Sequence, residues 1–265
     1  MTTNERGQVT RNPAEVYDEV FVPAALQQWA ERVADAAKLQ RGQRVLDVAC
    51  GTGVLTRAVA ERVGPEGAVV GLDRNEGMLA VARRNAPDIE WRQGNVEAMS
   101  FESRSFDAVV SQFGLIFFAN RRAVDEMTRV LRPGGHLAVA VWSRLEDSPG
   151  YAAFTDLLQR RVSAQAADEE RAAFALGDPQ LLRSHFEGAA LSDLKIETIE
   201  GTARFDSIRS MVLAEVYGWT LGEVMDEAQV EQLLQEAESV LQPFVTVDGT
   251  LVFPLSANIL AATKA

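Results

Sequence analysis

Residues 45–56 read Val-Leu-Asp-Val-Ala-Cys-Gly-Thr-Gly-Val-Leu-Thr, a short apolar run that stops at a glycine turn. The β-branched residues of the run favour a strand, and residues 54–63 combine helical apolar spacing with strong helix formers. The stretch therefore predicts a strand, a tight turn and a helix. In α/β sheets, such a turn at the carboxyl end of a strand is where ligands bind.

The turn differs from the dinucleotide fingerprint G-x-G-x-x-G at two places. Thr56 stands at the third glycine position, and Asp47 lies four residues before the first glycine. The fingerprint holds a diphosphate, which a carboxylate beside the turn would repel. Asp47 instead favours a ligand that carries an ammonium or sulfonium charge.

Composition places the chain among ordinary globular proteins. Its 265 residues are 47% hydrophobic and 24% charged, which fits one elaborated α/β domain with insertions. The net charge of -12 would repel phosphate backbones and anionic lipid, so nucleic acid is not an expected partner.

Cysteine usage and apolar runs narrow the class of protein further. Cys50 is the single cysteine, which excludes an internal disulfide and a multi-cysteine metal site, so no metal is expected. The first seven residues lack the apolar region of a signal peptide, and no apolar run approaches the roughly 18 residues of a membrane span. We expect a cytoplasmic protein.

Four more strands are predicted after the glycine turn, at residues 68–72, 89–93, 106–112 and 136–142. Strands that alternate with helices predict a parallel sheet with its site at the carboxyl edge. Residues 13–39 have helical apolar spacing, and Pro23 should break them into two helices.

Polar residues follow two of these strands. Asp73 follows Gly53 by about the 20 residues expected for a carboxylate that binds a ribose. The alternative is that Asp73 or Asn75 caps the next helix. After the strand at 89–93, a polar side chain can reach an adenine amine, while Met78 and Val96 pack its ring faces; ordinary helix core is the other interpretation of Met78.

These segments resemble, in order, the motif series of class I S-adenosylmethionine-dependent methyltransferases, in particular the UbiE/MenG-like small-molecule group. The resemblance covers residues 40–142 and rests on residues 47–53, Asp73, Gly94-Asn95, Gln112 and 130–135. It implies a Rossmann-like α/β fold with a seven-stranded, mostly parallel sheet, helices on both faces and a helical cover inserted among the late strands. The last strand would be antiparallel, with residues 194–204 and 251–262 as the final two strands.

The resemblance also implies S-adenosyl-L-methionine as the cofactor. Asp47 would favour its ammonium, residues 49–53 would contact the methionine moiety and ribose, Asp73 would hold the ribose, and Gln112 would line the methionine end. Asn95 stands where the family commonly has Asp, although its amide oxygen can still accept from the adenine amine. The complete cofactor-binding set that we expect is Asp47, Ala49, Cys50, Gly51, Thr52, Gly53, Asp73, Arg74, Met78, Gly94, Asn95, Val96, Gln112 and Phe113.

Three regions of a single domain are expected. Residues 1–40 would form helices that cover the cofactor site, residues 41–142 the binding core, and residues 143–265 the substrate cover with the last two strands. Aromatic residues and one histidine could line the substrate site, although core packing is the alternative for each: Trp142, Tyr151, Phe154, His185, Tyr217 and Trp219.

Methyl transfer by in-line displacement needs mainly alignment and exclusion of water. A general base is required only when the acceptor arrives protonated, and Tyr17 and His185 are the candidate catalytic residues. His136, at the start of a predicted buried strand, is interpreted as structural. The expected activity is methyl transfer to O, N or C of a small molecule. The first alternative is a regulatory protein or pseudoenzyme that binds the cofactor, and the second is an NAD-dependent oxidoreductase. The sequence does not decide between a monomer and a homodimer.

Overall fold

A computed structural model describes residues 2–3, 9–10, 12–218 and 225–265. The chain forms two compact units. The larger unit comprises Gln27–Arg144, Phe174–Glu200 and Ser256–Ala265, and the smaller comprises Met1–Leu26, Leu145–Ala173 and Gly201–Leu255. The chain therefore passes between the units at five points.

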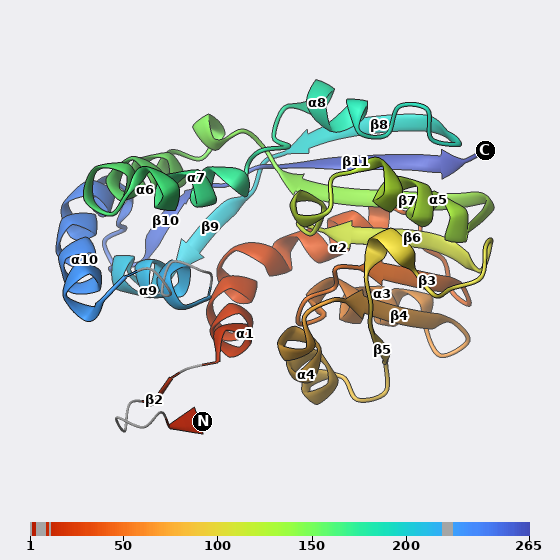
Figure 1. Ribbon diagram of the computed structural model, residues 1–265, viewed down its shortest axis with the longest axis horizontal. Coiled ribbons are helices and arrows are strands. Elements are labelled where there is room, and N and C mark those ends of the chain that lie inside the picture. Colours follow the sequence, from red (N-terminus) through yellow and green to blue (C-terminus); the bar gives the residue numbers. More distant parts are fainter. Residues whose placement is uncertain (1, 4–8, 11, 219–224) are drawn as a thin grey trace. The chain divides into compact units, whose positions relative to one another are not determined.

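The larger unit is built on a seven-stranded sheet (Figure 1). The predicted mostly parallel sheet is confirmed, because only β11 runs antiparallel to its neighbours, β7 and β8. In spatial order the strands are β5 (Glu90–Gln93), β4 (Ala68–Asp73), β3 (Arg44–Val48), β6 (Phe106–Gln112), β7 (Leu131–Trp142), β11 (Ala257–Lys264) and β8 (Leu191–Ile199).

Helices cover both faces of this sheet, as expected. Side chains alternate along β7: Val139 joins the apolar core that includes α5 and α8, while the Trp142 ring lies 6.0 Å from that of Trp29 in α2. The helical segments of the larger unit are α2 (Gln27–Ala36), α3 (Val54–Val63), α4 (Glu76–Asn85), η2 (Val96–Ala98), η3 (Leu115–Phe117), α5 (Arg121–Val130) and α8 (Pro179–Ser184).

The smaller unit packs helices around a two-stranded antiparallel ladder. Phe253 in this ladder lies at the centre, with the Tyr151 ring 5.3 Å away at a right angle and Phe244 6.0 Å away. A Cβ on Gly150 would come 2.4 Å from the Phe253 ring, so glycine is required there by close packing. The elements are β1 (Thr2–Thr3), β2 (Val9–Thr10), α1 (Pro13–Val16), η1 (Tyr17–Leu26), η4 (Leu145–Asp147), α6 (Pro149–Arg161), α7 (Ala164–Ala172), β9 (Thr202–Phe205), α9 (Ile208–Gly218), α10 (Glu227–Leu241), η6 (Gln242–Phe244) and β10 (Leu251–Pro254).

The last two predicted strands were wrong in extent. Each is divided in two: residues 194–204 give parts of β8 and β9, and residues 251–262 give β10 and part of β11. β9 pairs with β10 instead of extending the large sheet. The breaks coincide with Gly201, whose carbonyl accepts from the Leu255 N–H (3.0 Å), and with Pro254, which has no N–H to continue a ladder.

Two further boundaries differ from the prediction. Pro23 does not separate two helices but lies inside η1, a ten-residue π-helix that leads directly into α2. A π-helical turn uses a different hydrogen-bond spacing from the α-helical one that proline disrupts. β7 begins at Leu131 instead of at the predicted residue 136, and its register with β6 shifts between the pairs Phe106–Leu131 and Ala108–His136.

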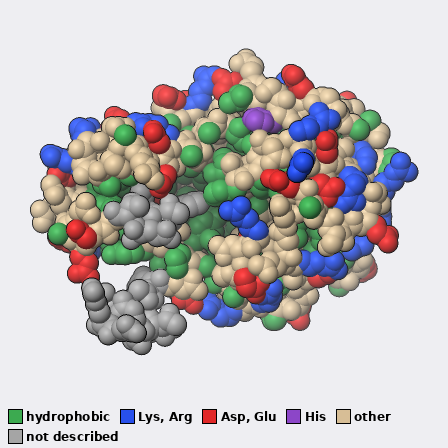
Figure 2. All heavy atoms as spheres, viewed as in Figure 1, with side chains coloured by type: hydrophobic (Ala, Val, Ile, Leu, Met, Phe, Trp, Pro, Cys, Tyr) green, Lys and Arg blue, Asp and Glu red, His purple; other side chains and the backbone are tan. Residues whose placement is uncertain are grey.

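In the part of the chain that the structure describes, no helix is both long and apolar enough to cross a membrane. Acidic and basic side chains are interspersed over the face of the larger unit seen in Figure 2.

Candidate functional site

The turn between β3 and α3 has an unusual backbone. Gly51 (φ 55°) and Gly53 (φ 84°) adopt left-handed conformations, and so does Ala49 (φ 55°), where a side chain makes that conformation costly. Gly53 is the N-cap of α3 and provides no side-chain cap, so the first N–H groups of this helix keep their capacity to bind an anion or a polar ligand atom.

Asp73, at the end of β4, holds this turn in place. Its Oδ2 accepts from the Gly51 N–H (2.8 Å), and its Oδ1 accepts from the Asn75 N–H (2.8 Å). Asn75 is the N-cap of α4, with its side-chain oxygen accepting from Gly77 and Met78, so Asp73 is not the cap. Each carboxylate oxygen of Asp73 still has lone-pair capacity for a ligand hydroxyl.

Asp47 in β3 is almost completely buried, with 1% of its surface exposed. Its Oδ2 accepts from the Thr56 hydroxyl (2.6 Å), whereas its Oδ1 has no hydrogen-bond partner among the described residues. Burial, with a smaller contribution from the charge of Asp73, raises the pKa of Asp47 to about 7, against the opposing hydrogen bond from Thr56. A cationic or hydrogen-bond-donating ligand would give Oδ1 a hydrogen-bond partner and would offset the free-energy cost of burying the carboxylate charge.

The absence of a Cβ at Gly53 serves packing. A Cβ there would lie 2.3 Å from Cη2 of Trp91, and one on Gly71 would lie 2.4 Å from Cε3 of the same ring. The indole N–H of Trp91 donates to the Ala86 carbonyl (2.8 Å), which fixes the ring in this place. Trp91 was not singled out from the sequence, because the signal is a pair of glycines in two different segments.

The segment after β5 is held by local contacts. Asn95 is the N-cap of η2, and its side-chain oxygen accepts from the Glu97 N–H (3.0 Å). Val96 is buried in the core of the larger unit, and a Cβ on Gly94 would meet Leu72 at 2.7 Å. The amide oxygen of Asn95 therefore already has one donor.

The other residues of the predicted set lie near these turns. Met78 is half-buried in the first turn of α4, and the carbonyl of exposed Arg74 accepts from the Gln93 amide (3.1 Å). Thr52 is buried, and its Oγ1 has no partner among the described residues. Cys50 is also buried, and burial raises the pKa of its thiol well above the ordinary value, so it is a poor nucleophile.

Aromatic rings follow β6. Half-buried Gln112 ends this strand, and Phe113 comes next in a left-handed conformation (φ 57°), with its N–H donating to the Ala140 carbonyl (2.9 Å). The Phe113 ring stacks on Trp142 with centroids 3.6 Å apart, and Trp29 contacts both rings edge-on. Trp142, a predicted substrate-lining residue, thus belongs to an aromatic cluster of the larger unit.

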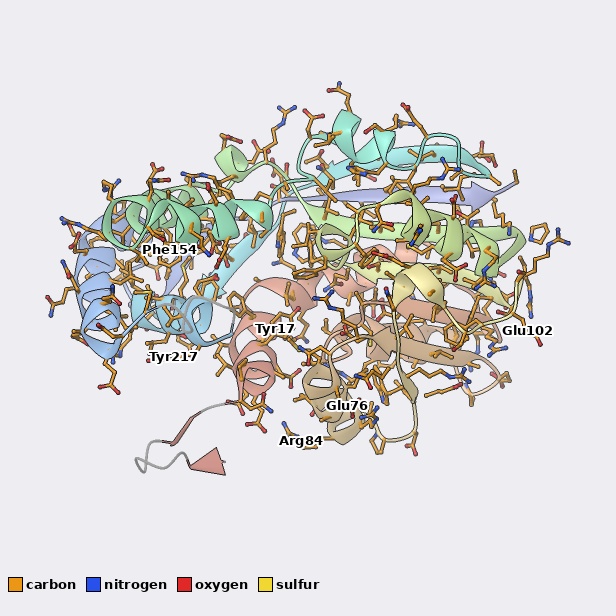
Figure 3. The ribbon with its side chains drawn as sticks, viewed as in Figure 1. Tyr17, Glu76, Arg84, Glu102, Phe154 and Tyr217 are labelled. Carbon is orange, nitrogen blue, oxygen red and sulfur yellow. The ribbon has the colours of Figure 1, made fainter. Side chains whose placement is uncertain are left out.

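The two candidate bases belong to different units. His185 is the C-cap of α8 in the larger unit and is half-buried. Tyr17 lies in η1 of the smaller unit, with its ring 6.0 Å from Phe21 (Figure 3). Phe154 and Tyr151 are buried in the smaller unit, Tyr217 is 43% exposed, and Trp219 lies outside the described residues.

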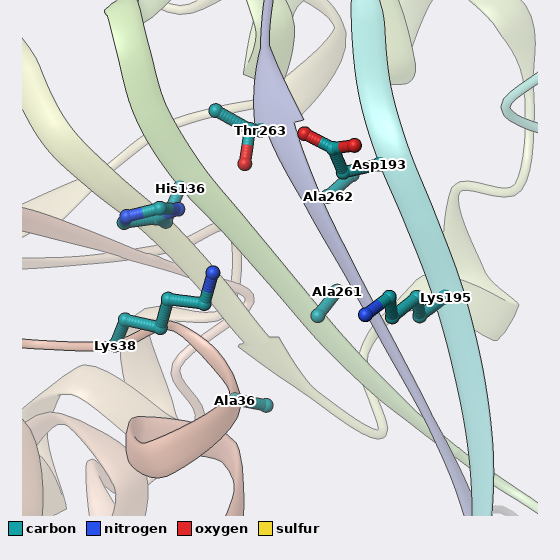
Figure 4. A pocket seen from close by; sticks show the side chains of 8 residues that line it. All are labelled: Ala36, Lys38, His136, Asp193, Lys195, Ala261, Ala262 and Thr263. Atoms are coloured by element: carbon teal, nitrogen blue, oxygen red, sulfur yellow. The ribbon is translucent and has the colours of Figure 1, made fainter.

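His136, interpreted as structural from the sequence, lines a shallow pocket on β7, β11 and β8 (Figure 4). Burial, and to a smaller degree the charge of Lys38, lower its pKa. The residues that line the pocket are Ala36, Lys38, His136, Asp193, Lys195, Ala261, Ala262 and Thr263.

Comparison with known proteins identifies the family. The chain matches the methyltransferase domain family over residues 45–135. It is 31% identical over 188 residues to a demethylmenaquinone methyltransferase of Staphylococcus carnosus, a match that covers 65% of this chain and 78% of that protein.

A second demethylmenaquinone methyltransferase, from Renibacterium salmoninarum, is 39% identical over 153 residues, or 57% of this chain. The match spans 63% of the length of that relative. Among solved structures, phosphoethanolamine N-methyltransferase 2 of Haemonchus contortus, in complex with phosphomonomethylethanolamine and S-adenosylhomocysteine, superposes with a TM-score of 0.62. It is 18% identical, and the superposition covers 98% of this chain and 58% of that one, so it supports the fold alone. With the glycine turn and seven-stranded sheet in place, the chain belongs to the UbiE-like class I S-adenosylmethionine-dependent methyltransferases.

Proposed function

We propose that this protein transfers a methyl group from S-adenosylmethionine to O, N or C of a small-molecule acceptor. The observation that carries the proposal is the pair of acidic side chains at the carboxyl ends of adjacent strands. Asp73 fixes the glycine turn through Gly51, and Asp47 lies buried beside the turn with an unpartnered oxygen. The relatives carry the same class of activity in their names.

The side chains present fit the groups of this cofactor. The unpartnered Oδ1 of Asp47 suits a buried ammonium, because the attraction between opposite charges offsets the cost of ionising the acid. Asp73 keeps lone pairs for the ribose hydroxyls. We assign the methionine moiety to residues 49–53 and Gln112, and the adenine to Met78, Asn95 and Val96.

When bound, the sulfonium supplies an activated methyl group with a good leaving group. The chain then has to align the acceptor with the S–CH₃ bond and exclude water. An acceptor that arrives as a phenol or a carbon acid also needs a base near neutral pH. We retain Tyr17 and His185 as the candidates for that role.

The acceptor class follows from the relatives. Both curated relatives are named for demethylmenaquinone, so quinone-like compounds are the first acceptors to test on this chain, followed by phenols and amines. The cytoplasmic location remains a prediction from the sequence.

The alternative of NAD is disfavoured by a specific contact. Thr56, at the third glycine position of the dinucleotide fingerprint, donates its hydroxyl hydrogen bond to Asp47. Asp47 and Thr56, the two residues that depart from the fingerprint, are therefore hydrogen-bonded to each other. Together they keep a carboxylate beside the turn, where it would repel a diphosphate.

Calorimetric titration with S-adenosylmethionine, S-adenosylhomocysteine and NAD tests the proposal. We expect the two adenosyl ligands to bind and NAD to give no signal. Binding of NAD alone would refute the proposal. Methyl transfer from labelled cofactor to the acceptor panel then separates an enzyme from a protein that only binds the cofactor.

A further inference from the structure

A pocket of about 190 Å³ lies beside the end of α2, on β7, β11 and β8 of the larger unit (Figure 4). Three of its lining residues are alanines, whose small side chains leave room for a ligand. His136 lines the pocket and lies six residues before Trp142 in β7, which is a distance of about 20 Å along a strand. Because Trp142 stacks on Phe113, the pocket lies at the opposite end of β7 from the proposed cofactor site.

Lysine is rare in this chain, and two of its three lysines line this pocket. The 26 basic residues comprise 23 arginines and only Lys38, Lys195 and Lys264. Lys264 has a structural role, because its Nζ donates to the carbonyls of Thr128 (2.7 Å) and Leu131 (2.9 Å). The other two lysines are in the pocket, which is therefore where the chain uses an ammonium in place of its usual guanidinium. An ammonium is a compact charge that binds phosphate groups well.

Neither pocket lysine has a counter-ion within residues 12–218 and 225–265. The ion pairs that these residues form all use arginine. In Figure 4, Lys38 extends toward His136, and Lys195 extends over β11 toward Ala261, so the two side chains reach the pocket from opposite sides. Two ammonium groups that share a pocket without a counter-ion attract an anion placed between them.

Two further side chains add hydrogen-bond donors. Half-buried His136 is paired with Thr263 in the ladder between β7 and β11, so their side chains lie on the same face of the sheet. Burial, and to a smaller degree the charge of Lys38, lower the pKa of His136, so its imidazole is neutral at pH 7 and has one N–H to donate. Among the described residues that line the pocket, Asp193 is the only acid, and its carboxylate is directed toward Thr263 in Figure 4.

The charges of the pocket select a small oxyanion with two negative charges. A phosphate monoester matches two ammonium groups, whereas a carboxylate is neutralised by one. The net charge of -12 and the carboxylate of Asp193 oppose a long polyanion such as nucleic acid. Lys195 alone could be explained as a charge that keeps the edge strand β8 from pairing with other chains, but Lys38 lies outside the strands.

We propose that the pocket between Lys38 and Lys195 binds the phosphate group of a small phosphorylated molecule. Bound there, the phosphate accepts hydrogen bonds from the two lysines, the His136 N–H and the Thr263 hydroxyl. The site is an addition to the proposed methyltransferase function and does not depend on it.

The two histidines of the chain provide a direct measurement, because His136 lines the pocket and His185 is the C-cap of α8, outside it. The protein is titrated with inorganic phosphate, glycerol 3-phosphate and acetate at constant pH and ionic strength, and the imidazole signals are followed by NMR. We expect the two phosphates to shift the His136 signal saturably, with a Kd of about 1 mM, and to bind at least about tenfold more tightly than acetate. Shifts that do not saturate, equal shifts of His185, or equal binding of acetate would overturn the proposal.

Charge-removing variants locate the phosphate. Lys38→Gln and Lys195→Gln should each weaken phosphate binding by about fivefold or more. Arg122→Gln is the matched control, because it removes the same charge from an exposed position on α5 outside the pocket and should leave the affinity unchanged. An equal loss in all three variants would attribute binding to overall charge and refute the site.

Asp193→Asn should change the affinity in the opposite direction. Asp193 has a left-handed backbone (φ 53°), which asparagine tolerates, so the variant removes a negative charge from the pocket and keeps the fold. Phosphate should bind about threefold more tightly to this variant. Such a gain cannot come from partial unfolding, and unchanged or weaker binding would contradict the proposal. Melting temperatures measured without phosphate verify that each variant is folded.

Discussion

Asp47 in the larger unit and Glu215 in the smaller unit are acids in the same physical situation. Each is at most 2% exposed and has one carboxyl oxygen without a hydrogen-bond partner among the described residues. They differ in how they are assembled. Asp47 and Thr56 lie nine residues apart in one strand-turn-helix segment, whereas Glu215 in α9 is influenced by groups on two other helices, Tyr151 in α6 and Glu170 in α7.

This difference decides what a sequence can reveal. A site within one local segment has a fixed spacing, and that spacing can be compared with known motifs. A site assembled from distant helices has no such spacing, so its residues look like ordinary helix positions until the helices are packed together. A buried acid with an unpartnered oxygen can therefore be predicted from the sequence in the larger unit but not in the smaller unit.

The comparison is tested most strongly by Asp47→Asn, which keeps an acceptor for Thr56 and removes the charge. In the wild type the folded state holds the Asp47 proton more tightly than the unfolded state does, because its pKa is about 7 when folded. Stability should therefore fall as pH rises from about 4 to 7, by up to about 4 kcal/mol from this residue. Asp47→Asn should lack that loss. Its advantage over the wild type in unfolding free energy, measured in urea without cofactor, should therefore be larger at pH 8 than at pH 5. An advantage that is equal at the two pH values would contradict the assignment.

The proposed ribose contact gives the next largest effect. Asp73→Ala removes the acceptor for Gly51 and for the cofactor, and should weaken S-adenosylmethionine binding by roughly a hundredfold or more. Asn75→Ala is the matched control in the same turn, because it removes only the cap of α4 and should cost about 1 kcal/mol of stability. Calorimetry that finds equal losses of affinity for both variants would leave Asp73 with only a structural role.

The packing of the turn can be tested without ligand. Gly53→Ala places a Cβ against Trp91 and keeps the left-handed backbone, so it should cost about 1–3 kcal/mol of unfolding free energy. In a Trp91→Leu background the cost should fall, because the ring contact is gone and only the backbone strain persists. The double-mutant cycle measures this coupling, and additive costs would refute the contact.

The smallest expected effect concerns Cys50. Its burial and raised pKa should make it nearly inert to iodoacetamide at pH 8 in the folded protein, while the urea-unfolded chain reacts freely. Mass spectrometry measures the extent of Cys50 alkylation in the folded and the unfolded protein. Rapid labelling of the native protein would show that the turn opens in solution and that Asp47 is less buried than described.

Much of the fold was predictable from the sequence. Four of the five strands of the first half, β3, β4, β6 and β7, could be recognised from their apolar runs, whereas β5 is mostly polar and exposed. The site turns follow the carboxyl ends of these strands. The division of the late strands was not predictable from the sequence. Gly201 and Pro254 each suggest an irregularity, but neither indicates that β9 and β10 pair with one another. The packing role of Trp91 could not be predicted, because it depends on two glycines that β4 and the start of α3 bring together.

The position of β11 has a consequence for how the protein is made. This strand is synthesised after β7 and β8, yet it lies between them and forms both antiparallel ladders. On the ribosome, β7 therefore has no native partner on one side until residues 257–264 have emerged. A hydrogen-bonding edge that stays open until then can pair with other chains. We expect chaperones that bind nascent chains to protect this edge, and slow elongation near residue 257 to lower the soluble yield.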